Sequence, residues 1–388
     1  MKVIIRAPLL SVSGYGVHSR QIFTYLENAK IFEINAQVVH WGTTPWLIDP
    51  DLENGQIGRI MSKTQEFSEP ADLSLQVQLP DEWDSNLARV NIGVSAVVET
   101  DRCNIKWVDA CNNMDAVIVP SQHAKDCLER SGNLSTRVFV IPEWFFPEVE
   151  TEDFDENKFS NMKFDTDFNF LILSQLTGQS SATDRKNILS TIKWICETFK
   201  DDKDVGIVIK TNHGRGTTID REITEGLIRH VISEVRDGPY PKITLVHGNL
   251  YPAEIAGLYR NDSIKALVSL TRGEGFGLPL LEAAASGLPV ISTNWSAHTE
   301  FLSLGRFIGI NYDLVNIPSE KVDDRIFVDG IRWADPHEDD FKNKILKFKN
   351  KSDLPRKWAQ DLSVKIRDQY SSRSIQQSYH DVLREILE

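Results

Sequence analysis

The stretch that decides the fold is residues 265–293, KALVSLTRGEGFGLPLLEAAASGLPVIST. The apolar run 265–270 predicts a buried strand, and the glycine-rich segment 271–277 predicts a loop. The following LPLLEAAAS predicts a helix, because Pro279 suits the first helical turn and Gly287 suits the end. A second apolar run, 289–293, predicts another strand. This strand–helix–strand order is typical of a parallel sheet covered by helices.

The same alternation of strand and helix patterns runs along most of the 388 residues. Short segments rich in Val and Ile predict strands in the first part of the chain at 3–7, 36–41, 73–79, 90–98, 116–121 and 137–142. A second series follows at 170–175, 205–211, 243–248, 265–270 and 289–293. Helical patterns lie between them, so we predict two doubly wound α/β domains, each with a parallel sheet.

A change in composition separates the two series of strands. Residues 148–167 contain eight acidic residues and two lysines without apolar periodicity, which favours a solvated linker. The last part of the chain is helical and charged. The predicted organisation is an N-terminal domain over 1–147, an acidic linker over 148–167, a C-terminal domain over 168–350, and C-terminal helices over 351–388 that pack back toward the N-terminal domain.

Composition narrows the class of protein. An apolar content of 41% and a charged content of 26% are typical of a folded globular protein, and we expect no transmembrane segment and a cytoplasmic location. Four cysteines without CxxC spacing indicate neither a zinc site nor a disulfide framework. The net charge of −13 disfavours a nucleic acid as partner but leaves one open.

The loop at 271–277 carries features of a binding site. Its glycines allow a ligand close to the main chain, and the amides at the start of the next helix favour an anion. Glu274 and Glu282 can accept hydrogen bonds from hydroxyls, Glu282 from a pair such as those of a ribose. The simpler interpretation has Glu282 stabilising its own helix by about 0.3–1 kcal/mol. The residues alone thus indicate a polyhydroxylated, anionic ligand.

Three other segments offer candidate contacts. Arg185 and Lys186 lie at a predicted helix start, where they suit a diphosphate or form an exposed basic pair. Lys210 ends a predicted strand. After the first strand, SGYGVH predicts a glycine loop that approaches phosphate, with the candidate residues Gly14, Tyr15, Gly16 and His18. It is a weak dinucleotide fingerprint, because Ser19 stands where a third glycine is needed.

The strings EGFGLPLLEA and SGLPVIST resemble the E-x7-E motif of retaining glycosyltransferases with the GT-B fold, specifically family 4. The resemblance implies two Rossmann-like doubly wound domains facing across a cleft, with C-terminal helices. It implies that Glu282 binds the ribose of the nucleotide. It also implies a donor-sugar site formed by Glu274, Gly275, Phe276, Gly277 and Leu278.

The resemblance extends to other loops. Lys186 matches the lysine that holds the diphosphate, and Arg185 substitutes for a basic residue that the family places near Gln175. The segment 247–255 resembles the loop that reads the nucleotide, which implies contacts from Gly248, Asn249 and Leu250, with Lys210 nearby. Glu99 matches the region near the reacting sugar. The expected catalytic residues are Glu274, Lys186, Arg185 and Glu99.

The implied reaction transfers a sugar, with retention, from a nucleoside-diphosphate sugar to the hydroxyl of a saccharide, lipid-linked or other glycan. A UDP- or GDP-sugar is the expected donor, and neither a metal nor an organic cofactor is expected. Three alternatives stay open: a hydrolase, phosphorylase or epimerase on the same scaffold, a non-catalytic partner subunit, and a transferase acting on a modified nucleic-acid base. The oligomeric state also stays open.

Overall fold

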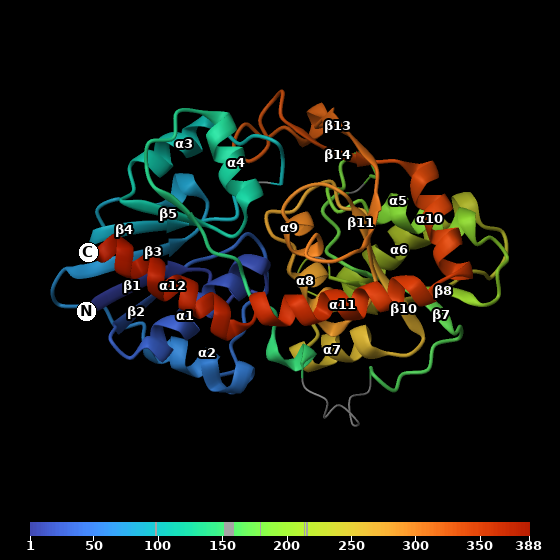
Figure 1. Cartoon of the computed structure of the whole chain (residues 1–388), viewed down its shortest axis with the longest axis horizontal. Helices are drawn as coiled ribbons and strands as arrows, with labels where there is room; N and C mark the ends of the chain where they lie inside the picture. Colours follow the sequence, from blue (N-terminus) through green and yellow to red (C-terminus); the bar gives the residue numbers. More distant parts are fainter. Residues whose placement is uncertain (98, 151–158, 179, 213, 215) are drawn as a thin grey trace. The chain divides into compact units, whose positions relative to one another are not determined.

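The structure is a computed structural model that describes residues 1–97, 99–150, 159–178, 180–212, 214 and 216–388. The chain divides into two compact units (Figure 1). The first unit comprises Met1–Trp144, Asp324–Val328 and Arg373–Glu388, and the second comprises Phe145–Asp323 and Asp329–Ser372. Both units are α/β, as the strand and helix patterns predict.

The first unit is built on a six-stranded parallel sheet in the order β2-β1-β3-β4-β5-β6. Its strands are β1 (Lys2–Ala7), β2 (Glu33–Val38), β3 (Ala71–Val77), β4 (Ala88–Val94), β5 (Ala116–Val119) and β6 (Val138–Val140). Its helices are α1 (Gly14–Ala29), α2 (Leu52–Ser62), α3 (Ile105–Asn112), α4 (Gln122–Ser131) and α12 (Ser372–Leu387). Two separate core clusters form, one with α1, α2 and α12 and one with α3 and α4.

The second unit has its own six-stranded parallel sheet in the order β12-β11-β10-β7-β8-β9. The strands are β7 (Phe168–Leu173), β8 (Val205–Thr211), β9 (Lys242–His247), β10 (Ile264–Ser269), β11 (Val290–Thr293) and β12 (Ile308–Ile310). A two-stranded antiparallel hairpin, β13 (Tyr312–Asn316) and β14 (Arg332–Pro336), follows the sheet.

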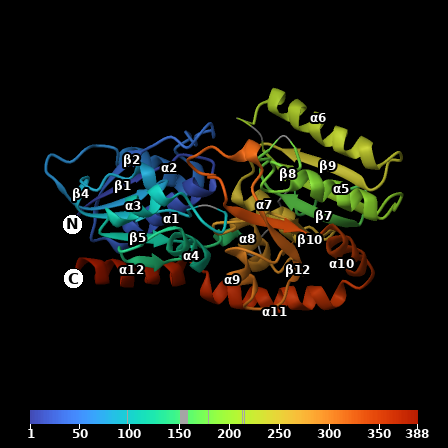
Figure 2. The same ribbon diagram turned by 90° about the horizontal axis from the view of Figure 1, so that it is seen from above.

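Helices cover both faces of this second sheet. They are α5 (Ile188–Thr198), α6 (Thr218–Val235), α7 (Pro252–Arg260), α8 (Leu278–Ser286), α9 (His298–Leu302), α10 (Glu338–Asn350) and α11 (Asp353–Gln369). Successive residues of β10 join opposite clusters: Leu267 packs with α7, α8, α9 and α11, whereas Ala266 and Val268 pack with α5, α6 and α10. Figure 2 shows α6 and α11 separated by the strands. This is the doubly wound arrangement that the sequence predicts.

Each predicted strand overlaps a strand of one of the two sheets, with ends shifted by a few residues. The sequence reasoning missed β12 and the β13–β14 hairpin. It did place α8: Gly277, with φ of +102°, precedes the helix, Pro279 lies in its first turn, and Gly287, with φ of +81°, ends it. Both glycines adopt the left-handed region that other residues avoid.

The limits of the two units differ from the predicted domain boundaries. The first segment of the first unit ends at Trp144. The described ends of the predicted linker belong to the second unit, where Val149 and Phe159 are buried in the core. Residues 151–158 of that linker lie outside the described residues. The C-terminal segment is divided, since α11 belongs to the second unit and residues 373–388 to the first. The packing of Val149 and Phe159 could not be predicted, because each is an isolated apolar residue in an acidic segment.

Two findings concern membranes and cysteines. Within the described residues, none of the helices is long and apolar enough to span a bilayer. All four cysteines are buried free thiols. Burial raises the pKa of the Cys196 thiol to about 11, so this cysteine is packed as a small apolar residue.

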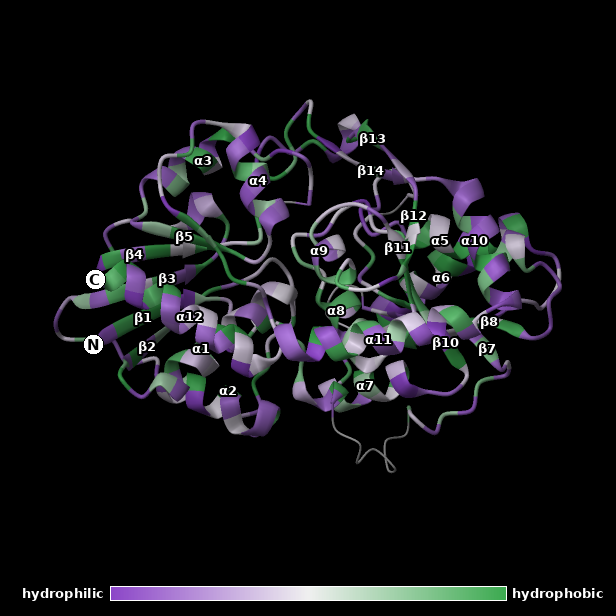
Figure 3. Ribbon diagram, viewed as in Figure 1, coloured by the Kyte–Doolittle hydropathy of each residue, from purple (hydrophilic) through white to green (hydrophobic). Residues whose placement is uncertain are grey.

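The last helix, α12, stabilises the first unit although it is far from it in sequence. It carries both hydrophilic and hydrophobic residues (Figure 3), and Ile375, Tyr379 and Leu383, spaced four residues apart, enter the core beside β1 and β3. Tyr379 Oη also lies 2.9 Å from Nε2 of the buried His18. The final turns of the chain are thus part of the first core.

We expect Leu383→Ala to lower the free energy of unfolding by about 2–5 kcal/mol, because it leaves a cavity in a close-packed core. The measurement is urea denaturation followed by tryptophan fluorescence and circular dichroism. His380→Ala, on the exposed side of the same helix, is the matched control and should change little. Equal midpoints for the two variants would show that α12 contributes no core packing.

Candidate functional site

The candidate site lies at the carboxyl edge of the second sheet. The loops that leave β7, β8, β10 and β11 all begin at this edge because the strands are parallel. Ligands of open α/β sheets bind there. These loops contain Arg185, Lys186 and residues 274–277, half of the residues that the sequence predicts for the second domain.

The loop after β7 is shaped by Asp184, a residue that sequence reasoning missed. Its carboxylate is fully buried and accepts hydrogen bonds from Thr177 Oγ1 at 2.7 Å, from the Lys186 amide at 3.2 Å and from the Ile188 amide at 2.7 Å. It satisfies helix-start amides of α5, as capping residues do. An acidic residue just before a basic pair at a helix start is the sequence signal for it. Asp184 thereby fixes the position of the main chain at Lys186.

Lys186 and Glu274 form an ion pair across 88 residues of sequence. The Lys186 ammonium lies 2.6 Å from both carboxylate oxygens of Glu274, and the two side chains are 17% and 9% exposed. Burial by itself raises the pKa of Glu274, but the positive charges of Lys186 and Arg185 outweigh it, so the pKa is lowered. Glu274 is therefore a carboxylate at neutral pH.

The two loops that carry this ion pair are also joined through their main chains. Arg185 donates from a guanidinium nitrogen to the Gly273 carbonyl at 2.9 Å. The Arg272 amide donates to the Arg185 carbonyl at 2.8 Å. The predicted basic pair therefore lies against the glycine-rich loop rather than on an exposed surface.

Arg272 links these loops to the β13–β14 hairpin, a contact that the sequence did not indicate. Its side chain is 8% exposed, forms an ion pair with Asp335 and lies 5.4 Å from the ring centre of Trp333. It also donates to the Ser181 carbonyl at 3.3 Å. In return the Ala334 amide donates to the Arg272 carbonyl at 2.9 Å. The hairpin is thus linked through Arg272 to the loop after β7 and to the loop after β10.

Within the predicted donor-sugar segment, the apolar side chains pack against the core of the second unit. The Phe276 ring is buried, 5.6 Å from the ring of Phe301, and Leu278 packs against the same core. Gly277 allows the chain to turn into α8. The apolar side chains of the segment therefore hold it in the core, and the Glu274 carboxylate is its charged group at the edge of the sheet.

Glu282 lies on α8 in a different environment. It is 7% exposed, and Tyr259 of α7 donates to its carboxyl group at 3.1 Å. Burial raises the pKa of Glu282 to about 8, and the negative charge of Glu148 adds to this rise. The group is therefore largely protonated at neutral pH. Tyr259 is a further residue that sequence reasoning missed.

The predicted nucleotide contacts lie at the next two strand ends. Lys210 is the last residue but one of β8 and is 9% exposed, and burial lowers the pKa of its side chain to about 8. Gly248, with φ of +106°, follows β9, and its amide donates to the Thr211 carbonyl at 3.2 Å. Asn249 accepts a hydrogen bond from Asn212 at 2.8 Å, and the partly buried Leu250 packs against the core.

The predicted glycine loop of the first unit is a helix instead. The residues assigned to it, Gly14, Tyr15, Gly16 and His18, lie in the first turns of α1. Ser13 caps this helix, since its hydroxyl accepts from the Gly16 amide at 3.1 Å. His18 is buried, and burial lowers its pKa to about 4. The prediction of a loop was wrong because these residues are helical, and their approach to a phosphate stays a prediction.

The partly buried Glu99 follows β4 in the first unit, and its role stays a prediction. Tyr15 lies in the same region, and its Oη is 2.9 Å from the Ser95 hydroxyl. Burial raises the pKa of Tyr15, and the charge of Glu99 raises it further.

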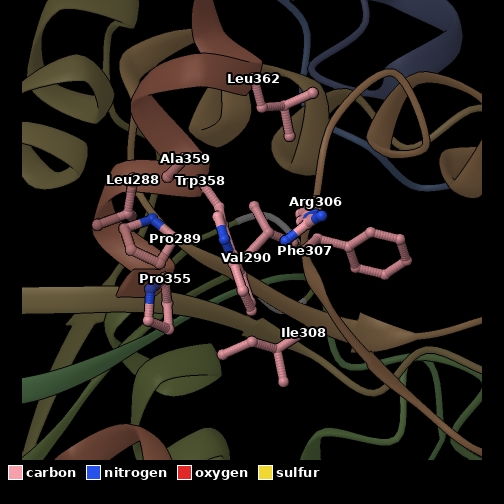
Figure 4. Close-up of a pocket in the computed structure, with 10 residues that line it drawn as sticks. All are labelled: Leu288, Pro289, Val290, Arg306, Phe307, Ile308, Pro355, Trp358, Ala359 and Leu362. Atoms are coloured by element: carbon pink, nitrogen blue, oxygen red, sulfur yellow. The ribbon is translucent and has the colours of Figure 1, made fainter. Parts of the chain in front are cut away.

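Figure 4 shows a hollow of different chemistry in the second unit. It is lined by Leu288, Pro289, Val290, Arg306, Phe307, Ile308, Pro355, Trp358, Ala359 and Leu362. Arg306 lies 5.6 Å from the ring centre of Trp358. The lining is mainly apolar, which does not suit a phosphate or sugar, so the hollow is not included in the candidate site.

Within the part of the chain that the structure describes, no group of three or more His, Cys, Asp or Glu residues could hold a metal ion. That no metal is needed stays a prediction.

Part of the chain matches a known protein family. Residues 240–361, which include α8, both glutamates and the β13–β14 hairpin, match the family model described as Glycosyl transferases group 1. The match covers less than half of the chain. No curated protein is significantly similar in sequence.

Solved structures share the fold along the whole chain. HepE of Anabaena, in complex with UDP and glucose, is 13% identical with a TM-score of 0.64, and 99% of this chain covers 100% of that one. Sucrose-phosphate synthase of Thermosynechococcus elongatus gives the same identity and TM-score, with 99% and 98% covered. The pneumococcal O-GlcNAc transferase GtfA, in complex with UDP and GlcNAc, is 17% identical with a TM-score of 0.52. There, 82% of this chain covers 57% of the longer one. These likenesses confirm the predicted GT-B fold.

The protonation of Glu282 predicts a pH-dependent stability. Between its unfolded pKa and about 8 the folded protein holds a proton that the unfolded chain lacks, so the contribution of Glu282 to stability falls as pH rises through this range. Glu282→Gln keeps the acceptor for Tyr259 and cannot ionise. The compared quantity is the free energy of unfolding of Glu282→Gln minus that of the unmutated protein. We expect this difference to be larger at pH 8 than at pH 5 by at least about 1 kcal/mol.

Chemical denaturation at both pH values measures this difference. The exposed Glu222→Gln is the control for removing a carboxylate and should show no such trend. A gap for Glu282→Gln that stays constant with pH would contradict a raised pKa.

Proposed function

We propose that this protein is a retaining glycosyltransferase of the family 4 type, which transfers a sugar from a nucleoside-diphosphate sugar to an acceptor hydroxyl. The observation that carries the proposal is the buried Lys186–Glu274 ion pair at the carboxyl edge of the second sheet. The match to Glycosyl transferases group 1 over residues 240–361 supports it. The UDP in the HepE and GtfA complexes favours a UDP-sugar as donor.

The donor site uses each charged group for a different part of the ligand. The Lys186 ammonium and the main chain at the start of α8 suit the diphosphate. The Glu274 carboxylate accepts hydrogen bonds from hydroxyls of the transferred sugar. Glu282 faces the ribose hydroxyls, and Arg185 and Lys210 add positive charge beside the phosphates. When the donor binds, part of the Lys186–Glu274 contact is replaced by contacts to the ligand.

The chemical step breaks the bond between the anomeric carbon and the diphosphate oxygen. The acceptor oxygen bonds to the same carbon on the same face, and its proton passes to the departing phosphate oxygen. Lys186 stabilises the negative charge that develops on the diphosphate, an effect of several kcal/mol in water-excluded sites. No protein nucleophile is needed, and no metal is assigned. Glu99 is proposed near the reacting sugar.

The acceptor is proposed to be a hydroxyl of a saccharide, lipid-linked or other glycan. A net charge of −13 weakens the association with nucleic acid that a base-modifying transferase would need. Transfer to such an acceptor, rather than hydrolysis of the donor, separates the proposal from a hydrolase on the same scaffold.

Binding of UDP, UDP-glucose, UDP-N-acetylglucosamine, GDP-mannose and ADP-glucose, measured by thermal shift and calorimetry, tests the proposal. We expect a UDP-sugar to raise Tm. Lys186→Met should weaken both UDP and the UDP-sugar by about tenfold or more, because it removes a charged contact to the diphosphate. Glu274→Gln should weaken the UDP-sugar more than UDP, because it removes a contact to the sugar.

Glu222→Gln is again the control and should bind as the unmutated protein does. The proposal fails if none of these nucleotides or nucleotide sugars raises Tm or binds in the calorimeter.

A further inference from the structure

The main chain of Glu274 is held by a segment just after β11. Its amide donates to the Ser296 hydroxyl at 2.9 Å, and its carbonyl accepts from the Ala297 amide at 3.3 Å. Both polar groups of the Glu274 peptide are thus bound to residues 296–297. The position of the loop is fixed independently of what the Glu274 side chain contacts.

Ser296 adopts an unfavourable conformation to make this contact. Its φ is +79°, in the left-handed region that favours glycine, and the residue is 6% exposed. Its carbonyl accepts from the amide of Thr299 at 3.0 Å and from the hydroxyl of Thr299 at 2.7 Å, which holds the conformation. Such strain persists where surrounding structure enforces it, often at functional sites. A glycine would fit the backbone better but would lack the hydroxyl.

His298 completes a hydrogen-bonded chain behind Ser296. Its ring is fully buried, with Nε2 2.7 Å from the Thr293 carbonyl and Nδ1 3.3 Å from the Ser296 hydroxyl. A carbonyl only accepts, so Nε2 carries a hydrogen. Burial lowers the pKa of His298 despite the opposing charge of Glu274, which keeps the ring neutral and leaves Nδ1 as an acceptor.

The direction of each hydrogen bond follows from that tautomer. The Glu274 amide donates to the Ser296 hydroxyl oxygen, the Ser296 hydroxyl donates to His298 Nδ1, and His298 Nε2 donates to the Thr293 carbonyl at the end of β11. The chain therefore ties the glycine-rich loop to the rigid sheet. His298 also packs against Gly277, where an added Cβ would lie 3.1 Å from the Cβ of His298.

We propose that Ser296 and His298 are positioning residues for the donor sugar: they hold the Glu274 main chain so that its carboxylate keeps its place when the ligand occupies Lys186. This inference rests on the proposed function. A diphosphate bound at the Lys186 ammonium would weaken the ion pair that fixes the Glu274 side chain. Once a diphosphate competes for that ammonium, the hydrogen bonds to the main chain are what keep the carboxylate directed at the sugar.

The first test is Ser296→Gly, which relieves the backbone strain and removes the hydroxymethyl side chain, and with it the hydroxyl that accepts from Glu274. We expect the affinity for UDP-glucose or UDP-N-acetylglucosamine, whichever the unmutated protein binds more tightly, to fall by about tenfold. The affinity for UDP should stay within about twofold and Tm should not fall, since a glycine tolerates positive φ. Ser303→Gly, at an exposed serine just after α9, is the matched control.

The second test separates the two arms of His298. In His298→Asn the side-chain oxygen can take the place of Nδ1 and accept from Ser296, whereas in His298→Gln the amide nitrogen can take the place of Nε2 and donate to Thr293. We expect the Asn variant to keep its UDP-sugar affinity within about threefold and the Gln variant to lose about tenfold. With an acceptor, the loss should be seen in KM for the UDP-sugar more than in kcat.

The outcomes are distinguishable. UDP-sugar binding by Ser296→Gly within twofold of the unmutated protein overturns the positioning role, as does equal loss of UDP and UDP-sugar together with a lower Tm. Tighter binding by the Gln variant than by the Asn variant also overturns it. If the unmutated protein binds UDP but no UDP-sugar, the positioning role falls and nucleotide binding stands. If it binds none of the nucleotides or nucleotide sugars tested for the proposed function, that function falls as well.

Discussion

The ion pair between Lys186 and Glu274 is the constraint on which the candidate site depends. Two opposite charges that are mostly buried must be held close together, because either one alone would be costly to bury. The structure meets this requirement from both sides. Asp184 fixes the start of α5 beneath Lys186, and Ser296 fixes the main chain of Glu274. Arg185 and Arg272 then join the two loops to each other and to the hairpin.

Glu274 and Glu282 have opposite protonation states at neutral pH. Glu274 faces cations and stays ionised, whereas Glu282 faces Tyr259 and a negative neighbour and holds its proton at neutral pH. Their spacing of eight residues first suggests an acid–base couple. Their surroundings instead suit two separate contacts to hydroxyls, one from a carboxylate that only accepts and one from a carboxyl group that can also donate.

Some of this could be predicted from sequence, because it depends on local pattern. Apolar runs located the strands, Pro279 and Gly287 located α8, and loops at the carboxyl edge of one parallel sheet brought Lys186 to Glu274. Features that depend on distant partners could not be predicted. Ser13 begins a helix through Gly14 although the glycines favoured a loop, and Val149 packs into a core although its neighbours are acidic. Ser296 and His298 belong to no periodic pattern, and only the folded backbone gives them a role.

Local charge, rather than the net charge of −13, decides whether this site can accept an anion. The Lys186–Glu274 pair is nearly neutral in itself, so any attraction for an anion must come from the groups around it. Arg185 contributes a positive charge, and burial lowers the pKa of Lys210 to about 8, so that Lys210 loses its charge as the pH rises through that value. An anion beside Lys210 would restore that charge. Because an amine with a pKa of about 8 is already mostly protonated at pH 7, the anion adds little to its charge, and the attraction comes mainly from the positive charges that Arg185 and Lys210 already carry.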